Sequence, residues 1–113
     1  MKYFDPAVGA DLETSVDRMV EAWADVTRTT MFGCPSYRAA DSLFALLVTD
    51  GVVLTRLPQE FRPDVEAAFE AGPFVAGNRT INKWVRIRVE SAEDVEGLRP
   101  FLQASYETAL LEG

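Results

Sequence analysis

The sequence predicts an α+β fold, in which helices pack on one face of an antiparallel sheet of four to five strands. Apolar residues recur at three- and four-residue spacing near both ends of the chain, which is the helical period. Between these segments, alternating or continuous apolar runs are separated by Gly, Pro and Asp, as strands are separated by turns. The chain has 113 residues, so we expect residues 1–113 to form a single compact two-layer domain.

A helix followed by short strands is expected first. Residues 11–27 place apolar side chains on one helical face, and either Asp11 or Asp5-Pro6 supplies the start signal. Three threonines then favour extended chain. We expect a short strand around residues 30–32 and another at residues 37–40.

The most clearly marked local structure is a hairpin. Residues 43–49 and 52–57 are apolar runs, and the Asp50-Gly51 pair between them is typical of a type I′ turn. This hairpin is apolar on both faces, but helices cover one face only. The other face must be covered by a loop, by the segment 72–78, or by a second subunit.

The second half of the chain predicts a helix and a long strand. Pro63 suits the first turn of a helix that Gly72 would end. Segment 72–78 is a loop or an irregular edge strand. Residues 79–89 then alternate cleanly, which predicts a strand with Val85 and Ile87 inside and with Arg86 and Arg88 outside.

The chain is expected to end in a helix. Residues 91–94 are typical of a capping box, but Gly97 and Pro100 interrupt the pattern, so we expect one helical turn and then a main helix over residues 99–111. The element order is thus α-β-β-β-α-β-α, with a candidate edge strand near residue 74. The expected core draws on all the helices and on the sheet: Val16, Val20, Trp23, Phe44 or Leu47, Phe69, Val85, Ile87, Leu102 and Tyr106.

Composition excludes several classes of function. The chain has no histidine and one cysteine, which removes the commonest general base, the Ser-His and Cys-His arrangements and any internal disulfide. Cys34 suits a tight turn, the acidic pairs suit polar helix surfaces, and Ser105 lacks the following lysine of an SxxK nucleophile. We therefore expect a non-enzymatic, cytoplasmic protein with no catalytic residue, metal or cofactor, no secretory signal and no membrane span.

Charge is distributed unevenly along the chain. The net charge of −7 opposes binding to bulk nucleic acid and to acidic membranes. Residues 79–88 nevertheless carry four basic residues and no acidic one, and Trp84 lies between them. Arginine with an aromatic side chain on one strand face is typical of a nucleic-acid surface. The alternative is an open sheet face whose arginines pair with carboxylates of the helices. The candidate binding residues, for nucleic acid or for a protein partner, are Arg79, Lys83, Trp84, Arg86 and Arg88.

Two stretches resemble known families. Met31-Phe32-Gly33, Tyr37, Leu43 to Leu47 and the following Asp50-Gly51 are similar to the N-terminal domain of TfoX/Sxy-type proteins. Asn82 to Ile87, with the terminal Ser105-Tyr106-Glu107, resembles the related MmcQ/YjbR-like family, and together the resemblance covers residues 12–111. Two departures are visible. Ala40-Asp41-Ser42 stands where the family usually has Gly and Lys, and Thr55 or Arg56 replaces a lysine on the strand after the turn.

The resemblance implies a compact α/β fold and a binding or regulatory role. Relatives include regulators of competence development and proteins proposed to bind DNA through a double-wing arrangement of hairpins, and no catalytic residue is carried over. We therefore expect weak, salt-sensitive nucleic-acid binding through residues 79–88, or binding of a protein partner. The alternative is a homodimeric interaction module with no nucleic-acid role. Self-association is expected to be allowed but not obligatory.

Overall fold

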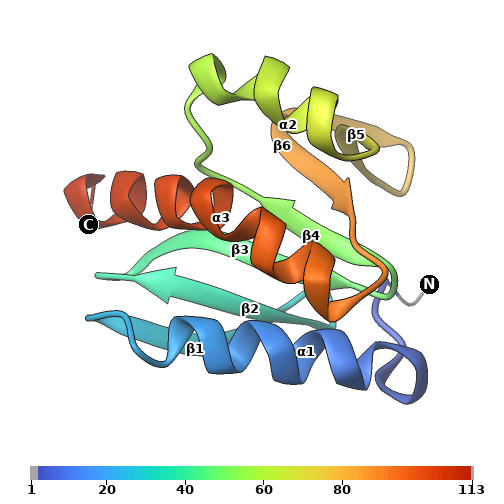
Figure 1. Ribbon diagram of the computed structural model, residues 1–113, viewed down its shortest axis with the longest axis horizontal. Helices are drawn as coiled ribbons and strands as arrows, with labels where there is room; N and C mark the ends of the chain where they lie inside the picture. Colours follow the sequence, from blue (N-terminus) through green and yellow to red (C-terminus); the bar gives the residue numbers. More distant parts are fainter. Residues whose placement is uncertain (1–2, 113) are drawn as a thin grey trace.

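The computed structural model describes residues 3–112 and has a six-stranded antiparallel sheet with helices packed on it (Figure 1). The helices are α1 (Pro6–Val20), α2 (Arg62–Ala68) and α3 (Ala92–Glu112), with a 3-10 turn, η1 (Gln59–Phe61). The strands are β1 (Val26–Met31), β2 (Cys34–Ala39), β3 (Ser42–Val48), β4 (Gly51–Leu54), β5 (Ala71–Ala76) and β6 (Arg79–Arg88), in the sheet order β1-β2-β3-β4-β6-β5. The α+β prediction is confirmed, but the sheet has six strands instead of four to five.

Helix α1 starts at the second of the two predicted signals. The Asp5 carboxylate accepts a hydrogen bond of 3.0 Å from the backbone N–H of Ala7, and Pro6 occupies the first helical position. The helix ends at Val20, earlier than predicted, because a turn with Asp25 at φ 62° leads directly into β1.

Tight turns set the first three strands. Phe32 and Gly33 both have positive φ, as do Ala40 and Asp41, so each pair makes a two-residue turn between antiparallel strands. The prediction of strands at 30–32 and 37–40 was therefore wrong in its bounds. Phe32 lies in the β1–β2 turn, and the strands on either side of that turn have six residues each.

The predicted β3–β4 hairpin is confirmed, but its turn is not of type I′. Thr49 and Asp50 form the turn without positive φ, and Gly51 pairs with Val48 as the first residue of β4. A Cβ atom on Gly51 would overlap the backbone carbonyl of Ile87. Glycine is thus needed there for the close approach of β4 to β6, and not for a turn.

The alternation of β6 is as predicted. Val85 and Ile87 are buried, and Arg86 and Arg88 are exposed. Every other predicted core residue is buried except Trp23 and Phe69, which are half-buried against the core.

Helices α1 and α3 lie across the same face of the sheet, and α2 lies beside β5 (Figure 1). The sheet curls, so that side chains from its two ends meet over the opposite face. The ring of Phe32, in the β1–β2 turn, lies 6.4 Å from the ring of Trp84 on β6, although two strands separate β2 from β6. Phe74 on β5 is 2% exposed, so the 72–78 segment contributes to this cover.

Two predictions on helix ends were wrong. Gly72 lies in β5 and does not cap α2, although Pro63 does lie in the first turn of α2. Helix α3 is continuous through Gly97 and Pro100. Proline removes only the hydrogen bond to the carbonyl of Glu96. Glu96 and Pro100 are both exposed, so water can bind to that carbonyl. The buried side chains around Pro100 hold the helix on the sheet.

Candidate functional site

The predicted binding residues of β6 fall into two groups. Arg86 and Arg88 lie where β6 pairs with β4, and Arg79 lies beside the β5–β6 turn. Lys83 lies in the irregular stretch of β6 between Ile81 and Val85, which pair with the consecutive residues Phe74 and Pro73 of β5. Arg79 and Arg88 are nine residues apart, which is about 30 Å along an extended strand. The structure therefore does not gather the four cations into one strip.

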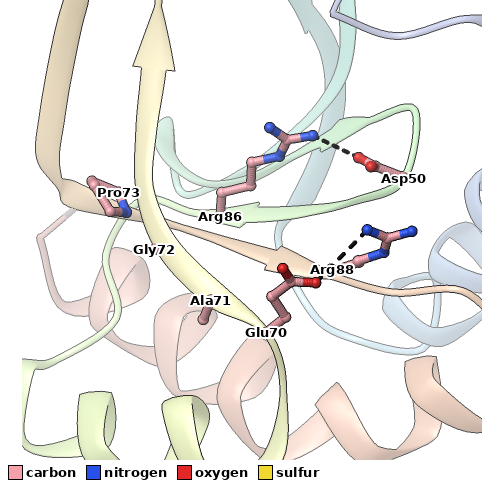
Figure 2. Close-up of a pocket in the computed structure, with 7 residues that line it drawn as sticks. All are labelled: Asp50, Glu70, Ala71, Gly72, Pro73, Arg86 and Arg88. Carbon is pink, nitrogen blue, oxygen red and sulfur yellow. Dashed lines mark hydrogen bonds and ion pairs between the residues drawn. The ribbon is translucent and has the colours of Figure 1, made fainter.

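Arg86 is held by a carboxylate of the same chain. Its Nη2 atom donates a hydrogen bond of 2.6 Å to Oδ1 of Asp50 in the β3–β4 turn, and the two side chains point toward each other in Figure 2. This hydrogen bond holds the pKa of the Asp50 carboxyl below its ordinary value. Both side chains are half-exposed, so the pair orients Arg86 more than it stabilises the fold.

Arg88 is paired in the same way, on the same face. It donates to Oε1 of Glu90 at 3.0 Å, and its Nη1 atom lies 3.7 Å from Oε2 of Glu70. The hydrogen bond to Glu90, the charge of Glu90 and then the charge of Glu70 raise the pKa of the Arg88 guanidinium. An open groove of about 320 Å³ lies between these groups and is lined by Asp50, Glu70, Ala71, Gly72, Pro73, Arg86 and Arg88 (Figure 2). With Glu90 beside them, the two arginines face three carboxylates.

Trp84 belongs to an aromatic cluster of Tyr3, Phe32, Phe74 and Trp84. The Trp84 ring lies 5.9 Å from Phe74 and 6.4 Å from Phe32, measured between ring centroids. Tyr3 contacts both of these phenylalanines. The cluster joins the two ends of the curled sheet, so Trp84 has a packing role. Within the cluster, Phe32 remains about half exposed to solvent.

Arg79 and Lys83 are exposed, and within residues 3–112 neither forms an ion pair. They are the cations of β6 that remain available to a ligand.

The other side chains considered as reactive have structural roles. Cys34 is buried, and burial raises the pKa of its thiol, which disfavours the nucleophilic thiolate. Ser105 is also buried. Its hydroxyl donates to the carbonyl of Phe44 at 2.7 Å and accepts from the backbone N–H of Arg56 at 3.1 Å. Ser105 thus fastens α3 to the sheet.

A polar network links α1 to the β1–β2 hairpin, and no local sequence pattern predicts it. The buried Tyr37 donates from its hydroxyl to Oδ1 of Asp17 at 2.6 Å. Arg28 donates to the other oxygen of Asp17 at 2.8 Å and pairs with Glu13. Burial and the bond to Asp17 raise the pKa of Tyr37 far above its ordinary value.

The fold and these contacts can be compared with known proteins. The family model of the TfoX N-terminal domain matches residues 18–109. The chain belongs to the TfoX N-terminal domain family. The match to this TfoX N-terminal domain runs from the last turn of α1 into α3 and includes β1 to β6. No curated protein and no solved structure matches the chain. Membership of the family indicates a binding or regulatory module.

The positions at which this TfoX N-terminal domain departs from the family pattern make contacts within the chain. Thr55 is buried and donates from its hydroxyl to the carbonyl of Leu43 at 2.8 Å, and Arg56 pairs with Glu112 at the end of α3 at 2.8 Å. Ala40 and Asp41 form the left-handed turn before β3.

Within the described part of the chain, no helix combines the length and the apolar character needed to cross a membrane.

Proposed function

We propose that this TfoX N-terminal domain is a non-enzymatic, cytoplasmic regulatory module that binds a protein partner and not nucleic acid. The observation that carries the proposal is the pairing of Arg86 with Asp50 and of Arg88 with Glu70 and Glu90. A phosphate group would have to displace these carboxylates, and the net charge of −7 opposes its approach. The aromatic partner that stacking on bases would need, Trp84, is occupied by Phe32 and Phe74.

A second candidate function is weak nucleic-acid binding at the β5–β6 turn. It is favoured by Arg79 and Lys83, which are exposed and form no ion pair within residues 3–112. Phe32 is exposed at the nearby end of the aromatic cluster and could stack on a base. Two cations allow only a few phosphate contacts, so binding there would be confined to low salt.

Two double variants that remove equal charge separate these functions. Fluorescence anisotropy with labelled single-stranded DNA, duplex DNA and RNA is measured at low ionic strength for the wild type, Arg86→Ala/Arg88→Ala and Arg79→Ala/Lys83→Ala. The first proposal expects no binding by any of the three proteins. Binding that only Arg79→Ala/Lys83→Ala removes would establish the second candidate. Binding that Arg86→Ala/Arg88→Ala removes would overturn the first proposal, because the paired arginines would then be the ligand site.

A further inference from the structure

The two edge strands of the sheet differ in how open they are. Strand β5 contains Pro73, pairs irregularly with β6 and contacts α2, and these features discourage another strand from adding to it. Strand β1 has neither proline nor glycine, and three of its six residues are threonine. Its one charged side chain, Arg28, is turned to the α1 carboxylates. Strand β1 is therefore an unprotected edge.

The pairing of β1 with β2 shows which backbone groups of this edge are free. Across a two-residue turn the flanking pair, Met31 and Cys34, is hydrogen-bonded, and bonded and non-bonded pairs then alternate. The backbone N–H of Ala40 donates to the carbonyl of Asp25 at 3.2 Å, in agreement with this alternation. The backbone groups that point away from β2, and that have no other partner within residues 3–112, belong to Val26, Arg28 and Thr30.

A groove of about 320 Å³ runs beside this edge, between α1 and β1. Its lining includes the apolar side chains of Val20, Trp23 and Val26, and the carboxylates of Asp17 and Glu21. The other side of the Trp23 ring is covered by Tyr106, 4.9 Å away between ring centroids. A side chain on a strand added to β1, opposite Val26, would enter this groove because directly paired residues share a face.

Charge identifies the side chain that fits. Glu13 and Asp17 share the single guanidinium of Arg28. Glu21 is exposed and forms no ion pair in the described part of the chain. Three carboxylates thus face one cation. A lysine or arginine meets both requirements, since its aliphatic stem can pack on Trp23 and Val26 while its charged end reaches Glu21.

We propose that β1 binds an extended segment of a partner protein as a seventh strand, with a lysine or arginine of that segment opposite Val26. Backbone hydrogen bonds to Val26, Arg28 and Thr30 supply affinity, and the α1–β1 groove supplies selectivity for the cation. The inference rests on the proposed protein-binding function and adds its surface and the chemistry of its partner. A second copy of the chain is the less suitable occupant, because it would bring two acidic α1 helices together.

Defined peptides test this directly. The probe is the peptide Ser-Thr-Val-Thr-Val-Lys-Val-Thr-Val-Thr-Ser with blocked ends, whose five residues on each side of Lys reach Thr30 in either strand direction. Its control has Glu in place of Lys. Isothermal titration of the full chain should show binding of the Lys peptide and much weaker binding of the Glu peptide, with the difference shrinking as salt is added. Failure of the wild type to bind the Lys peptide, or equal binding of the two peptides, would overturn the proposal.

Matched variants locate the binding surface. Thr30→Pro removes an outward N–H of β1, and Val75→Pro makes the same change at an exposed, outward position of β5. Thr30→Pro should weaken binding about tenfold, the effect of losing roughly one hydrogen bond and the fit of the strand, and Val75→Pro should bind as the wild type does. Glu21→Gln should weaken binding about two- to fivefold, against no change for Glu66→Gln on α2. Equal binding by Thr30→Pro and Val75→Pro would exclude β1.

Amide hydrogen exchange gives a test that needs no variant. The Lys peptide should slow exchange at Val26, Arg28 and Thr30, and leave the β2-bonded amides of Thr27 and Thr29 unchanged. Protection elsewhere on the surface would overturn the site. A wild-type dimer in sedimentation that Thr30→Pro dissociates would assign the edge to a second copy instead. The proposed function is tested by the nucleic-acid titration, and the β1 site is tested by the peptides. Failure of one proposal can therefore be told from failure of the other.

Discussion

Arg86 Nη2 lies 2.6 Å from Asp50 Oδ1, which links the outer face of β6 to the turn between β3 and β4. The two residues are 36 positions apart in the chain. The contact places a carboxylate over the strand that carries the densest positive charge of the sequence. It therefore decides how that charge is used, because a guanidinium bound to a carboxylate is not free to bind phosphate.

Gly51→Ala should destabilise the protein by about 1–3 kcal/mol, because the added methyl group would overlap the Ile87 carbonyl, a backbone atom that cannot rotate away. Gly72→Ala is the control, since nothing lies within 4 Å of its Cβ position. Urea denaturation gives the free energy of unfolding of both variants. Equal stability of the two would contradict the close approach of β4 and β6.

Ser105→Ala should lower the free energy of unfolding by about 1–3 kcal/mol. The substitution leaves the Arg56 N–H without its partner, and the Phe44 carbonyl keeps only the hydrogen bond that it accepts from the N–H of Thr55. Thr108→Ala, on the same helix, removes only a bond from the hydroxyl to the Ala104 carbonyl, which the helix already uses, and should be nearly neutral. If thermal or urea unfolding shows Ser105→Ala to be as stable as the wild type, the hydrogen bonds of Ser105 do not hold α3 on the sheet.

Stability at alkaline pH should depend on Tyr37. Its pKa is raised in the folded protein, so below about pH 10 the hydroxyl is protonated in both states and has no effect on the pH dependence. Above pH 10 the unfolded chain loses this proton and the folded chain keeps it. The free energy of unfolding should then fall by up to about 1.4 kcal/mol per pH unit for this group.

Tyr37→Phe tests that dependence. The variant should be less stable at pH 7 by about 1 kcal/mol, since Asp17 loses the hydrogen bond, and its stability should fall less steeply above pH 10. Urea unfolding between pH 7 and pH 11 measures both effects. A slope equal to that of the wild type would mean that Tyr37 ionises in the folded protein.

Ala40→Gly should stabilise the protein by about 1 kcal/mol. Ala40 has φ 48°, a left-handed conformation that costs an L-residue about 1–2 kcal/mol and costs glycine little. Ala39→Gly, at the buried end of β2, should be destabilising. A loss of stability in Ala40→Gly would contradict the turn geometry.

Local patterns were sufficient for much of the fold. Alternation predicted that Val85 and Ile87 are buried and that Arg86 and Arg88 are exposed, because a buried face imposes a period of two on the strand. Proline was a weaker guide. Pro100 lies inside α3, where buried neighbours such as Leu102 hold the helix in place of the missing hydrogen bond. Tertiary packing thus outweighed a local helix breaker.

The sequence predicted that Arg86 and Arg88 are exposed on one strand face, and it left open whether they bind a ligand or pair with carboxylates of the helices. The carboxylates that hold them come from a turn, from Glu70 before β5 and from Glu90. Of these carboxylates, only that of Glu90 is close to the two arginines in the sequence. Such partners depend on the sheet order, in which β6 lies between β4 and β5, and no local pattern encodes that order.

Releasing the arginines tests the central claim most directly. The groove variant, Asp50→Asn/Glu70→Gln/Glu90→Gln, removes the three carboxylates that face Arg86 and Arg88. The α2 variant, Glu60→Gln/Asp64→Asn/Glu66→Gln, removes three exposed carboxylates from α2 and the 3-10 turn before it, with the same change in net charge. In an anisotropy titration with single-stranded DNA at low salt, the wild type and the α2 variant should not bind. The groove variant should bind, with a slope of log K against log salt of about −1 to −2 for the two freed cations. Binding by the wild type equal to that of the groove variant would contradict the claim that carboxylates of the same chain occupy these arginines.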